Sequence, residues 1–209
     1  MKKNMAKSFE FRDLKTEIEF ADFSKCYMDS FRGKKLNPIQ AIKAETLKSY
    51  KRVIGIYQGE KIVAGYVINQ YPHRCFEYLT TEEKEKIISS VGGEKKVCEI
   101  VAIWKSPSIS RLTFAFKIWS AIVFDTLKER RSYIFGCSYA GHGMVKRYAI
   151  LNPKLVRQGK DDNDLTVFYF HRWQFLITYV VGMIIVVPRE LYRKAARIWL
   201  TNKRAMNEQ

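Results

Sequence analysis

The chain has 209 residues, of which 47% are hydrophobic and 14% aromatic. That content supports one packed domain, with room for a short appendage, and excludes wholesale disorder. Its 37 Lys and Arg residues outnumber 21 Asp and Glu residues, so the formal net charge is +16. A charge of this size predicts an anionic partner: nucleic acid, a membrane surface, an acidic carrier protein or a phosphorylated cofactor.

The cysteines and histidines give no metal-binding or disulfide pattern. No two cysteines form a CxxC pair, and the basic start "MKKNMAKSFEFRD" lacks the apolar stretch of a secretory signal. We therefore expect reduced thiols and a cytoplasmic protein. The histidines lack ligand spacing, so no metal is expected. The residues concerned are Cys26, Cys75, Cys98, Cys137, His73, His142 and His171.

The N-terminal third alternates between strand and helix signals. Residues 8–14 alternate apolar and polar side chains and predict a strand, while residues 17–31 have the apolar spacing of an amphipathic helix. Asn37 followed by Pro38 predicts the start of a second helix. Two β-branched runs flank Gln58–Lys61, a pattern that predicts a β-hairpin.

The middle of the chain continues this alternation. A capped helix is predicted from Thr80 or Thr81 to Gly92-Gly93, followed by an apolar strand up to Lys105. A long helix is expected from about Ser110 to Arg131, and because it is apolar around much of its circumference it should be covered on more than one side. Residues 133–139 predict another strand, followed by a short helix and two more strands. The order indicates an α/β (α+β) protein with a mixed sheet covered by helices on both faces.

Two stretches carry a resemblance to a known superfamily. "EIVAIWKSPSISR" (residues 99–111) has a strand, a proline and then an arginine, and "SYAGHGMVKRYAIL" (residues 138–151) places Tyr148 three residues before Leu151. Over residues 8–171 this resembles the GNAT N-acyltransferase superfamily. "SISR" is also similar to acyl-homoserine-lactone synthases and long-chain N-acyl amino acid synthases. The turn before the long helix has no glycine, and Asn152-Pro153 stands where the family has Gly-Phe.

The resemblance implies a splayed central sheet that holds the phosphopantetheine arm of acyl-CoA or acyl carrier protein (acyl-ACP). The helix after the central strand would point its N-terminus at the donor's phosphates. Arg111 could instead be a solvated charge, and Ser110 a helix N-cap. The residues that the resemblance places at the donor are Ile103, Lys105, Ser106, Ser108, Ser110, Arg111, Cys137 and Ser138.

Acyl transfer to an amine needs a base for the ammonium, a hydrogen-bond donor for the oxyanion and an acid for the departing thiolate. The resemblance points to Glu99 and His142 as base candidates and to Tyr148 as the acid. Glu99 could instead pair with Lys95 or Lys96, and Tyr148 could simply pack under the sheet. A Cys137–His142 nucleophile is conceivable, but direct attack by the amine is the family's usual course.

A hydrophobic and basic extension follows the last predicted strand, so the chain divides into residues 1–171 and 172–209. Residues 173–187 are almost wholly apolar, but they are short of the about 20 residues that a spanning helix needs. Residues 189–204 read as a basic amphipathic helix. Three alternatives stay open: attachment of residues 173–204 to an anionic membrane, packing on the domain or across a homodimer, and a single membrane span.

The sequence as a whole therefore predicts an N-acyltransferase that moves an acyl group from a CoA or acyl-carrier-protein thioester to a small-molecule amine. The acyl chain could be long and the site of action a membrane surface. The alternative is a non-catalytic GNAT-like module that acts as a scaffold. Specific nucleic-acid binding is not expected, because the basic residues are spread along the chain and no binding motif is present.

Overall fold

The computed structural model describes residues 8–31, 42–139, 152–159 and 165–185, together with residues 188 and 192. Within this part of the chain, seven strands form one mixed sheet. Their order is β1-β2-β3-β4-β5-β7-β6, and β4 runs parallel to β5 while the other neighbours are antiparallel. This confirms the predicted fold class. The strands are β1 (Phe9–Asp13), β2 (Arg52–Gln58), β3 (Lys61–Asn69), β4 (Val97–Lys105), β5 (Tyr133–Tyr139), β6 (Lys154–Arg157) and β7 (Leu165–His171).

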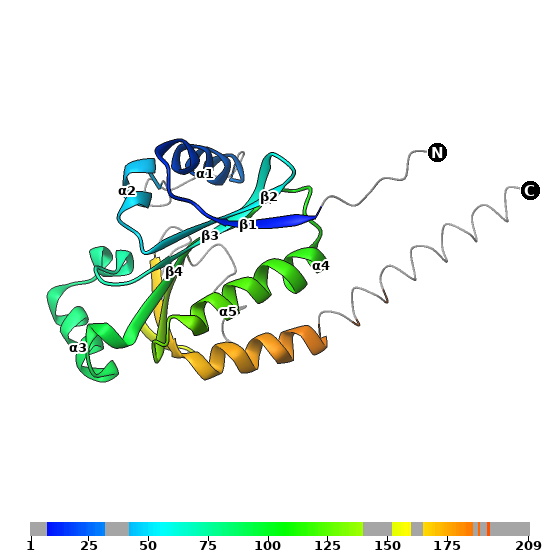
Figure 1. Cartoon of the computed structure of the whole chain (residues 1–209). Coiled ribbons are helices and arrows are strands. Elements are labelled where there is room, and N and C mark those ends of the chain that lie inside the picture. Colours follow the sequence, from blue (N-terminus) through cyan, green and yellow to red (C-terminus); the bar gives the residue numbers. More distant parts are fainter. Residues whose placement is uncertain are drawn as a thin grey trace, which may run out of the picture.

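Helices fill the connections between these strands and cover both faces of the sheet. Figure 1 shows α1 and α2 on one side of the strands and the long helix, with residues 172–185, on the other. The helices are α1 (Glu17–Asp29), α2 (Ala44–Lys48), α3 (Thr81–Val91), the short turns η2 (Arg74–Tyr78) and η3 (Glu94–Lys96), and one continuous long helix made of α4 (Arg111–Thr113), the π-helical segment η4 (Phe114–Trp119) and α5 (Ser120–Lys128).

Local capping signals set several of the helix ends. Thr16 starts α1 and Thr80 starts α3, each in a capping box in which a glutamate three residues on bonds back to the cap. Gly92 ends α3 with φ of 74°, a left-handed conformation that glycine adopts without strain. The predicted hairpin is also present, since Gln58 pairs with Lys61 around Gly59.

The second helix differs from the prediction. It begins at Ala44, and Lys43 before it is extended, so a continuous helix from Asn37 is wrong over these residues. The extended backbone inserts Ile42 into the core, where it is 3% exposed, and lets the Ser24 hydroxyl donate to the Ile42 carbonyl. Asn37 and Pro38 lie outside the described residues.

Alternate residues of the strands face opposite layers. Cys98 of β4 and Ile134 of β5 pack with Ile118 and Ile122 of the long helix. Their neighbours on the other face, such as Val97 and Phe135, pack with η2 and α3. The α1–α2 layer covers a separate cluster on that same face, around Phe23, Leu47 and Trp104. Two separate clusters thus lie on the face opposite the long helix.

The long helix contacts two neighbours, as its apolar circumference predicts, but it is not covered all round. One side packs on the sheet, and Trp119 contacts Phe175 of the segment 172–185. Phe116 and Phe124 remain exposed on its outer side. It ends at Lys128, three residues before the predicted Arg131.

The helix at residues 172–185 packs on the domain through one side. Phe175 is 2% exposed in the same cluster as the long helix, and Tyr179 hydrogen-bonds Ser120. Figure 1 shows this helix beside α5. Its outer side is apolar and exposed. Among the described residues, no helix has both the length and the apolar character needed to cross a membrane.

Candidate functional site

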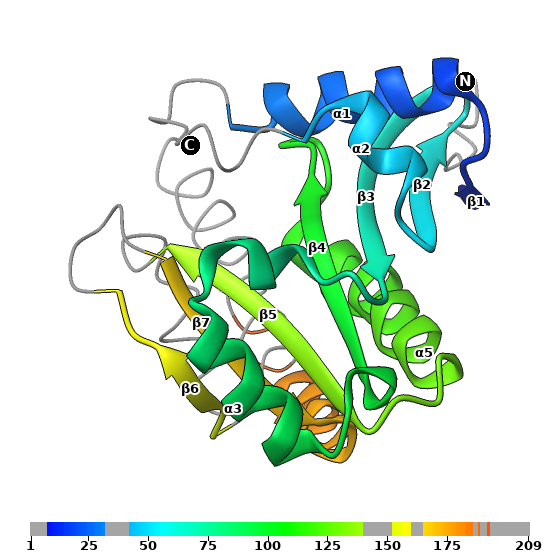
Figure 2. The ribbon, with the colours of Figure 1, turned by 90° about the vertical axis from the view of Figure 1, so that its left-hand side faces the viewer.

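The central feature of the site is the divergence of β4 from β5. The two strands pair through Val97, Cys98 and Glu99, which lie opposite Tyr133, Ile134 and Phe135, and the pairing then stops although both strands continue. Figure 2 shows the two strands spreading apart toward their C-terminal ends. Among the described residues, the β5 side of β4 beyond Glu99 therefore has no strand partner, and its peptide groups can bind something else.

A β-bulge lies on β4 just past this point. Gly65 of β3 pairs with Trp104 but Val67 pairs with Val101, so β4 contains one extra residue, and Ala102 has φ of 52°. A bulge takes one residue out of the ladder and bends the strand. It turns the end of β4 away from β5 and widens the opening between them.

The turn after β4 is held by its own polar groups. The Ile109 N–H donates to the Ser106 carbonyl, and the Ser106 and Ser108 hydroxyls bond each other at 2.9 Å. Lys105 folds over the turn and donates to the Ile109 carbonyl at 2.8 Å. Ile109 is buried in the core beneath. The turn is thus rigid without glycine, because side chains supply its internal bonds.

Ser110 is the N-cap of the long helix. Its hydroxyl accepts from the Thr113 N–H at 3.0 Å and bonds the Thr113 hydroxyl at 2.8 Å. Arg111 is the first helical residue, and its side chain is exposed. The first N–H groups of a helix lack intrahelical acceptors and carry partial positive charge. The turn therefore presents a helix start and a guanidinium to solvent, an arrangement suited to an anion.

Glu99 is fully buried, and its carboxylate anchors η2. One oxygen accepts from the Cys75 N–H at 2.7 Å, and the other accepts from the Arg74 N–H at 2.8 Å and from the Asn69 amide at 3.1 Å. The alternative of pairing with Lys95 or Lys96 is not what the structure shows. Glu99 fixes η2 at the apex of the opening between β4 and β5.

His73, the residue before η2, is buried among aromatic rings. It stacks on Phe135 at 6.1 Å between centroids and meets Phe76 edge-on at 5.0 Å. Burial lowers the pKa of His73, and the nearby Glu99 opposes this effect only in part. The imidazole is therefore a neutral core group at neutral pH.

Arg74 leads from Glu99 to two tyrosines. Its guanidinium donates to the Tyr50 hydroxyl at 3.5 Å and also hydrogen-bonds Tyr78. Burial raises the pKa of Tyr50 to about 12, with Arg74 opposing this effect and Glu99 adding to it. Burial of the guanidinium lowers the pKa of Arg74. The nearby phenol oxygens of Tyr50 and Tyr78 raise this pKa by more, so the pKa of Arg74 lies above its usual value. Three polar groups from the α2–β2 connection and from η2 thus meet beside the anchored Glu99.

Cys137 and Ser138 lie on β5 past the last β4 pair, as predicted. Cys137 is half-buried on the α3 face and hydrogen-bonds the thiol of Cys75, while Ser138 is almost fully buried. Burial, together with the neighbouring Cys137, raises the pKa of Cys75 well above its usual value, so Cys75 remains a thiol. All four cysteines are free.

The remaining predicted residues fall in different places. Ile103 is half-buried on β4, one residue after the bulge, and packs against the long-helix cluster. His142 and Tyr148 lie outside the described residues. Within the described ranges, no group of three or more His, Cys, Asp or Glu side chains is arranged to hold a metal ion.

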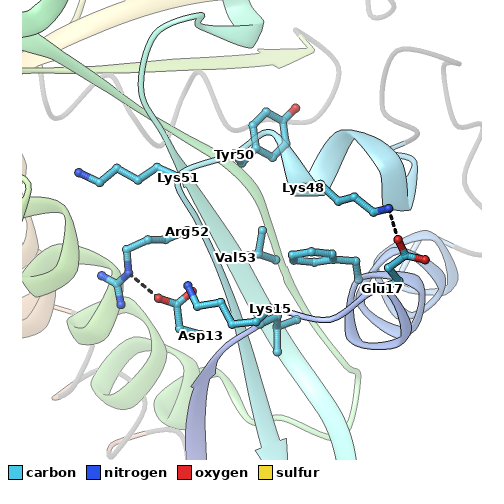
Figure 3. Close-up of a pocket in the computed structure, with 10 residues that line it drawn as sticks. Asp13, Lys15, Glu17, Lys48, Tyr50, Lys51, Arg52 and Val53 are labelled. Carbon is cyan, nitrogen blue, oxygen red and sulfur yellow. Dashed lines mark hydrogen bonds and ion pairs between the residues drawn. The ribbon is translucent and has the colours of Figure 1, made fainter.

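A pocket of about 360 Å³ lies elsewhere, between the start of β2 and the β1–α1 connection. Figure 3 shows Glu17 paired with Lys48, and Asp13 paired with Arg52, around its wall. Tyr50 lies at its edge. The lining also includes Lys15, which pairs with Asp13, and Lys51, which pairs with Glu129, so each of its four cationic side chains has a carboxylate partner.

Sequence reasoning missed the Tyr50–Arg74–Tyr78 cluster and the Ala102 bulge. Arg74 lies in the connection between β3 and α3, and the sequence shows there only "YPHRCFEYL", which has no recognised site pattern. Tyr50 is 24 residues earlier. A bulge depends on how two strands pair, which the sequence of one strand does not show.

Comparisons with known proteins agree with this geometry at the level of fold. No protein-family model and no curated protein sequence matches the chain. Among solved structures, the chain is similar to FeeM, an N-acyl amino acid synthase from uncultured soil microbes, with a TM-score of 0.64, 12% identity, and coverage of 85% of this chain and 98% of that one.

Two further structures show the same architecture. A putative acetyltransferase of the GNAT family from Desulfovibrio desulfuricans gives a TM-score of 0.53 at 12% identity, covering 79% of this chain and 99% of that one. The AHL synthase LasI gives 0.51 at 9% identity, covering 79% and 88%. The chain therefore has the GNAT fold, and the predicted structural resemblance to both branches is confirmed.

Proposed function

We propose that the protein is an N-acyltransferase that moves an acyl group from a phosphopantetheine thioester to an amine. The observation that carries this proposal is the opening between β4 and β5, which begins at Glu99 and leads into a side-chain-bonded turn and a capped helix. An extended thioester arm fits between two such strands because the free edge of β4 offers peptide groups along its length.

The donor is acyl-CoA or acyl carrier protein, which share the same phosphopantetheine arm. Arg111 and the first N–H groups of the long helix would bind its phosphate, beside Ser108 and Lys105. The net charge of +16 suits either an anionic cofactor or an acidic carrier. The residues that we assign to the donor are Ile103, Lys105, Ser106, Ser108, Ser110, Arg111, Cys137 and Ser138.

The amine would attack the thioester carbonyl directly. A C–N bond forms, the C–S bond breaks, and the ammonium proton leaves to a base while the thiolate takes a proton from an acid. Peptide N–H groups near the Ala102 bulge would hold the oxyanion. We assign Tyr148 as the acid and His142 as the base. Glu99, which we also predicted as a base, accepts from two N–H groups of η2 and from the Asn69 amide, so we assign it to positioning.

The outer side of residues 172–185 supports action at a membrane surface on a long acyl chain. Its exposed side chains recur at helical spacing, and residues 189–204 are rich in Lys and Arg. An apolar helix face beside basic residues binds anionic lipid. A homodimer through the same face is the alternative occupant. The exposed apolar residues are Trp173, Ile177, Val180, Val181, Ile184 and Ile185.

One observation favours the competing function, a non-catalytic scaffold. The hydroxyls of Ser106, Ser108 and Ser110 all bond within the turn or the helix start, so the turn is complete without a donor. A module that had lost its donor would still keep this fold. Binding of a thioester separates the two functions.

The decisive experiment measures binding and transfer together. The full chain is incubated with acetyl-, decanoyl- and palmitoyl-CoA and with decanoyl-ACP, complexes are detected by native mass spectrometry, and thiol release is followed with an amine pool. We expect at least one long-chain donor to bind and turn over. Tyr148→Phe should lower turnover by about tenfold or more and leave donor binding unchanged.

An Arg111→Gln variant provides the matched test of the donor site. It should weaken donor binding and leave folding intact, because Arg111 is exposed. If none of the donors binds the wild-type protein, the scaffold function replaces the enzyme. Unchanged turnover in Tyr148→Phe would remove Tyr148 from the mechanism.

A further inference from the structure

The long helix carries an aromatic stripe on the side that faces away from the sheet. Phe116 is 46% exposed and Phe124 is 57% exposed, while Ile118 and Ile122 of the same helix are buried in the core. Ser120 lies four residues from each phenylalanine, so the three side chains share one side of the helix. Large apolar side chains that gather on one exposed face are typical of an interaction surface.

This stripe is continuous with the exposed apolar side of the helix 172–185. The Ser120 hydroxyl bonds the Tyr179 hydroxyl, and Trp119 meets Phe175 edge-on at 5.8 Å between ring centroids. Figure 1 shows the two helices side by side on one face of the sheet. Their outer sides therefore face away from the sheet together, and one apolar surface extends over both helices.

The charges around this surface identify its occupant. Residues 172–185 contain no Asp or Glu, and the long helix contains only Asp125, which pairs with Lys128. Arg111 and Lys117 are exposed near the start of the long helix, and Lys128 is exposed at its end. An apolar surface bordered by cations suits anionic lipid. A second copy of the chain would instead bring the same cations and a further net charge of +16 against it.

The surface reaches the turn that we assign to the donor. Phe116 follows Arg111 by five residues, which is roughly 8 Å along a helix axis. A helix that binds a membrane interface lies in its plane, with the apolar side at the boundary between headgroups and acyl chains. On a bilayer, Arg111 and the start of the long helix would thus lie at the level of the lipid headgroups.

We propose that the long helix and the helix 172–185 together form the face with which the protein lies on an anionic bilayer, and that long-chain acyl-CoA reaches the donor turn from this bilayer. The second part rests on the proposed N-acyltransferase function. A long-chain acyl-CoA is an amphiphile that places its acyl chain among the lipid tails and its phosphates among the headgroups. The donor phosphate and Arg111 then meet at the same level.

The first test maps the membrane contact and needs no enzyme activity. Phe116→Trp, Phe124→Trp and Ile18→Trp proteins are bound to phosphatidylglycerol–phosphatidylcholine vesicles with brominated acyl chains, which quench tryptophan fluorescence on contact. We expect quenching beyond that of the wild type at positions 116 and 124. Ile18→Trp is the control and should show no added quenching, because Ile18 lies on α1, on the other side of the sheet.

A protein that does not bind these vesicles would overturn the proposal. So would a bound protein whose added tryptophans at positions 116 and 124 are quenched no more than the one at position 18, since the helix 172–185 or the basic residues would then bind without the long helix. Binding to vesicles of phosphatidylcholine alone should be at least about tenfold weaker. Equal binding to both kinds of vesicle would contradict the assignment to anionic lipid.

The second test asks where the donor comes from. Turnover of palmitoyl-CoA, which partitions into vesicles, is compared with that of octanoyl-CoA, which stays mainly in water. We expect the anionic vesicles to raise palmitoyl-CoA turnover by about fivefold or more and to leave octanoyl-CoA turnover within about twofold. A Phe116→Glu, Phe124→Glu double variant should lose the increase and keep the octanoyl-CoA rate, because neither side chain belongs to the donor turn.

The two tests separate failure of the membrane face from failure of the enzyme reaction. Quenching at positions 116 and 124 without turnover of any donor would support the membrane face and overturn the proposed function. Turnover of palmitoyl-CoA that vesicles leave unchanged or lower, in a protein that binds them, would overturn delivery of the donor from the bilayer. An Ile18→Glu variant that lost the vesicle effect equally would overturn the role of the aromatic stripe.

Discussion

Glu99 has an environment that its position in the sequence does not indicate. The sequence places it on the central strand as a base candidate. In the structure its carboxylate accepts from two backbone N–H groups and one amide, all more than twenty residues away in sequence. The base role remains a prediction, but the hydrogen bonds favour a carboxylate that holds η2 and, through it, Arg74.

His73 carries the pH dependence that belongs to the residue scale. Burial lowers the pKa of His73 from its usual 6.5, so the unfolded chain takes up a proton more readily than the folded one. The free energy of unfolding should therefore fall as pH drops below about 6.5. Urea denaturation at about pH 7.5 and pH 5.5 measures the change.

His73→Leu should flatten that pH dependence while keeping an apolar group against Phe76 and Phe135. The carboxylates whose pKa values are lowered, such as Glu19 and Glu83, titrate further into acid and leave this window clear. An identical slope in His73→Leu would rule out His73 as the cause.

At the scale of elements, a sequence pattern predicted the structure correctly where the turn or helix end is formed by the residues of the pattern itself. The cap at Thr80 and the hairpin at Gly59 are examples. The helix predicted from Asn37 failed over residues 42–43 because burial of Ile42 required an extended backbone. Tertiary contacts overrode a local preference there.

Replacing glycine by alanine should have opposite effects on stability at Gly65 of β3 and at Gly182 of the helix 172–185. A Cβ added to Gly65 of β3 would lie 2.4 Å from the Phe23 ring, 2.8 Å from the Ile54 carbonyl and 2.9 Å from Trp104. Gly65→Ala should therefore destabilise the protein by about 2 kcal/mol or more, because the backbone carbonyl cannot move aside. Denaturant midpoints measure the loss.

Gly182 in the helix 172–185 is the matched control. A Cβ there meets nothing within 4 Å, so Gly182→Ala should raise the free energy of unfolding by about 1 kcal/mol through helix propensity alone. A destabilising Gly182→Ala would mean that the outer side of this helix is covered in solution. That outcome would favour the homodimer over the membrane.

At the scale of the whole molecule, the proposed membrane attachment depends on the exposed apolar side of residues 172–185. Ile177 is 61% exposed and Ile184 is 67% exposed. An Ile177→Asp, Ile184→Asp double variant should bind vesicles of phosphatidylglycerol and phosphatidylcholine at least about tenfold more weakly than the wild type, because it replaces buried apolar contact with charge. Vesicle sedimentation measures this.

Ile18→Asp is the control for that experiment, since Ile18 is 77% exposed on α1, on the opposite side of the sheet. It should bind vesicles like the wild type. Equal loss in both variants would show a non-specific effect of charge. A wild-type protein that ignores vesicles and sediments as a dimer would replace the membrane with a second copy of the chain.

The sequence alone determined the fold class, the position of the turn before the long helix and the order of the main strands and helices among the described residues, because periodicity and capping are properties of neighbouring residues. The short helix predicted between β5 and β6 lies outside the described residues. The tertiary structure decided that β4 and β5 separate after Glu99, that Ala102 forms a bulge and that Arg74 meets Tyr50 and Tyr78. These features depend on strand pairing and on side chains brought together from distant segments. Such contacts arise only when the hydrophobic faces pack, so no local pattern in the chain records them.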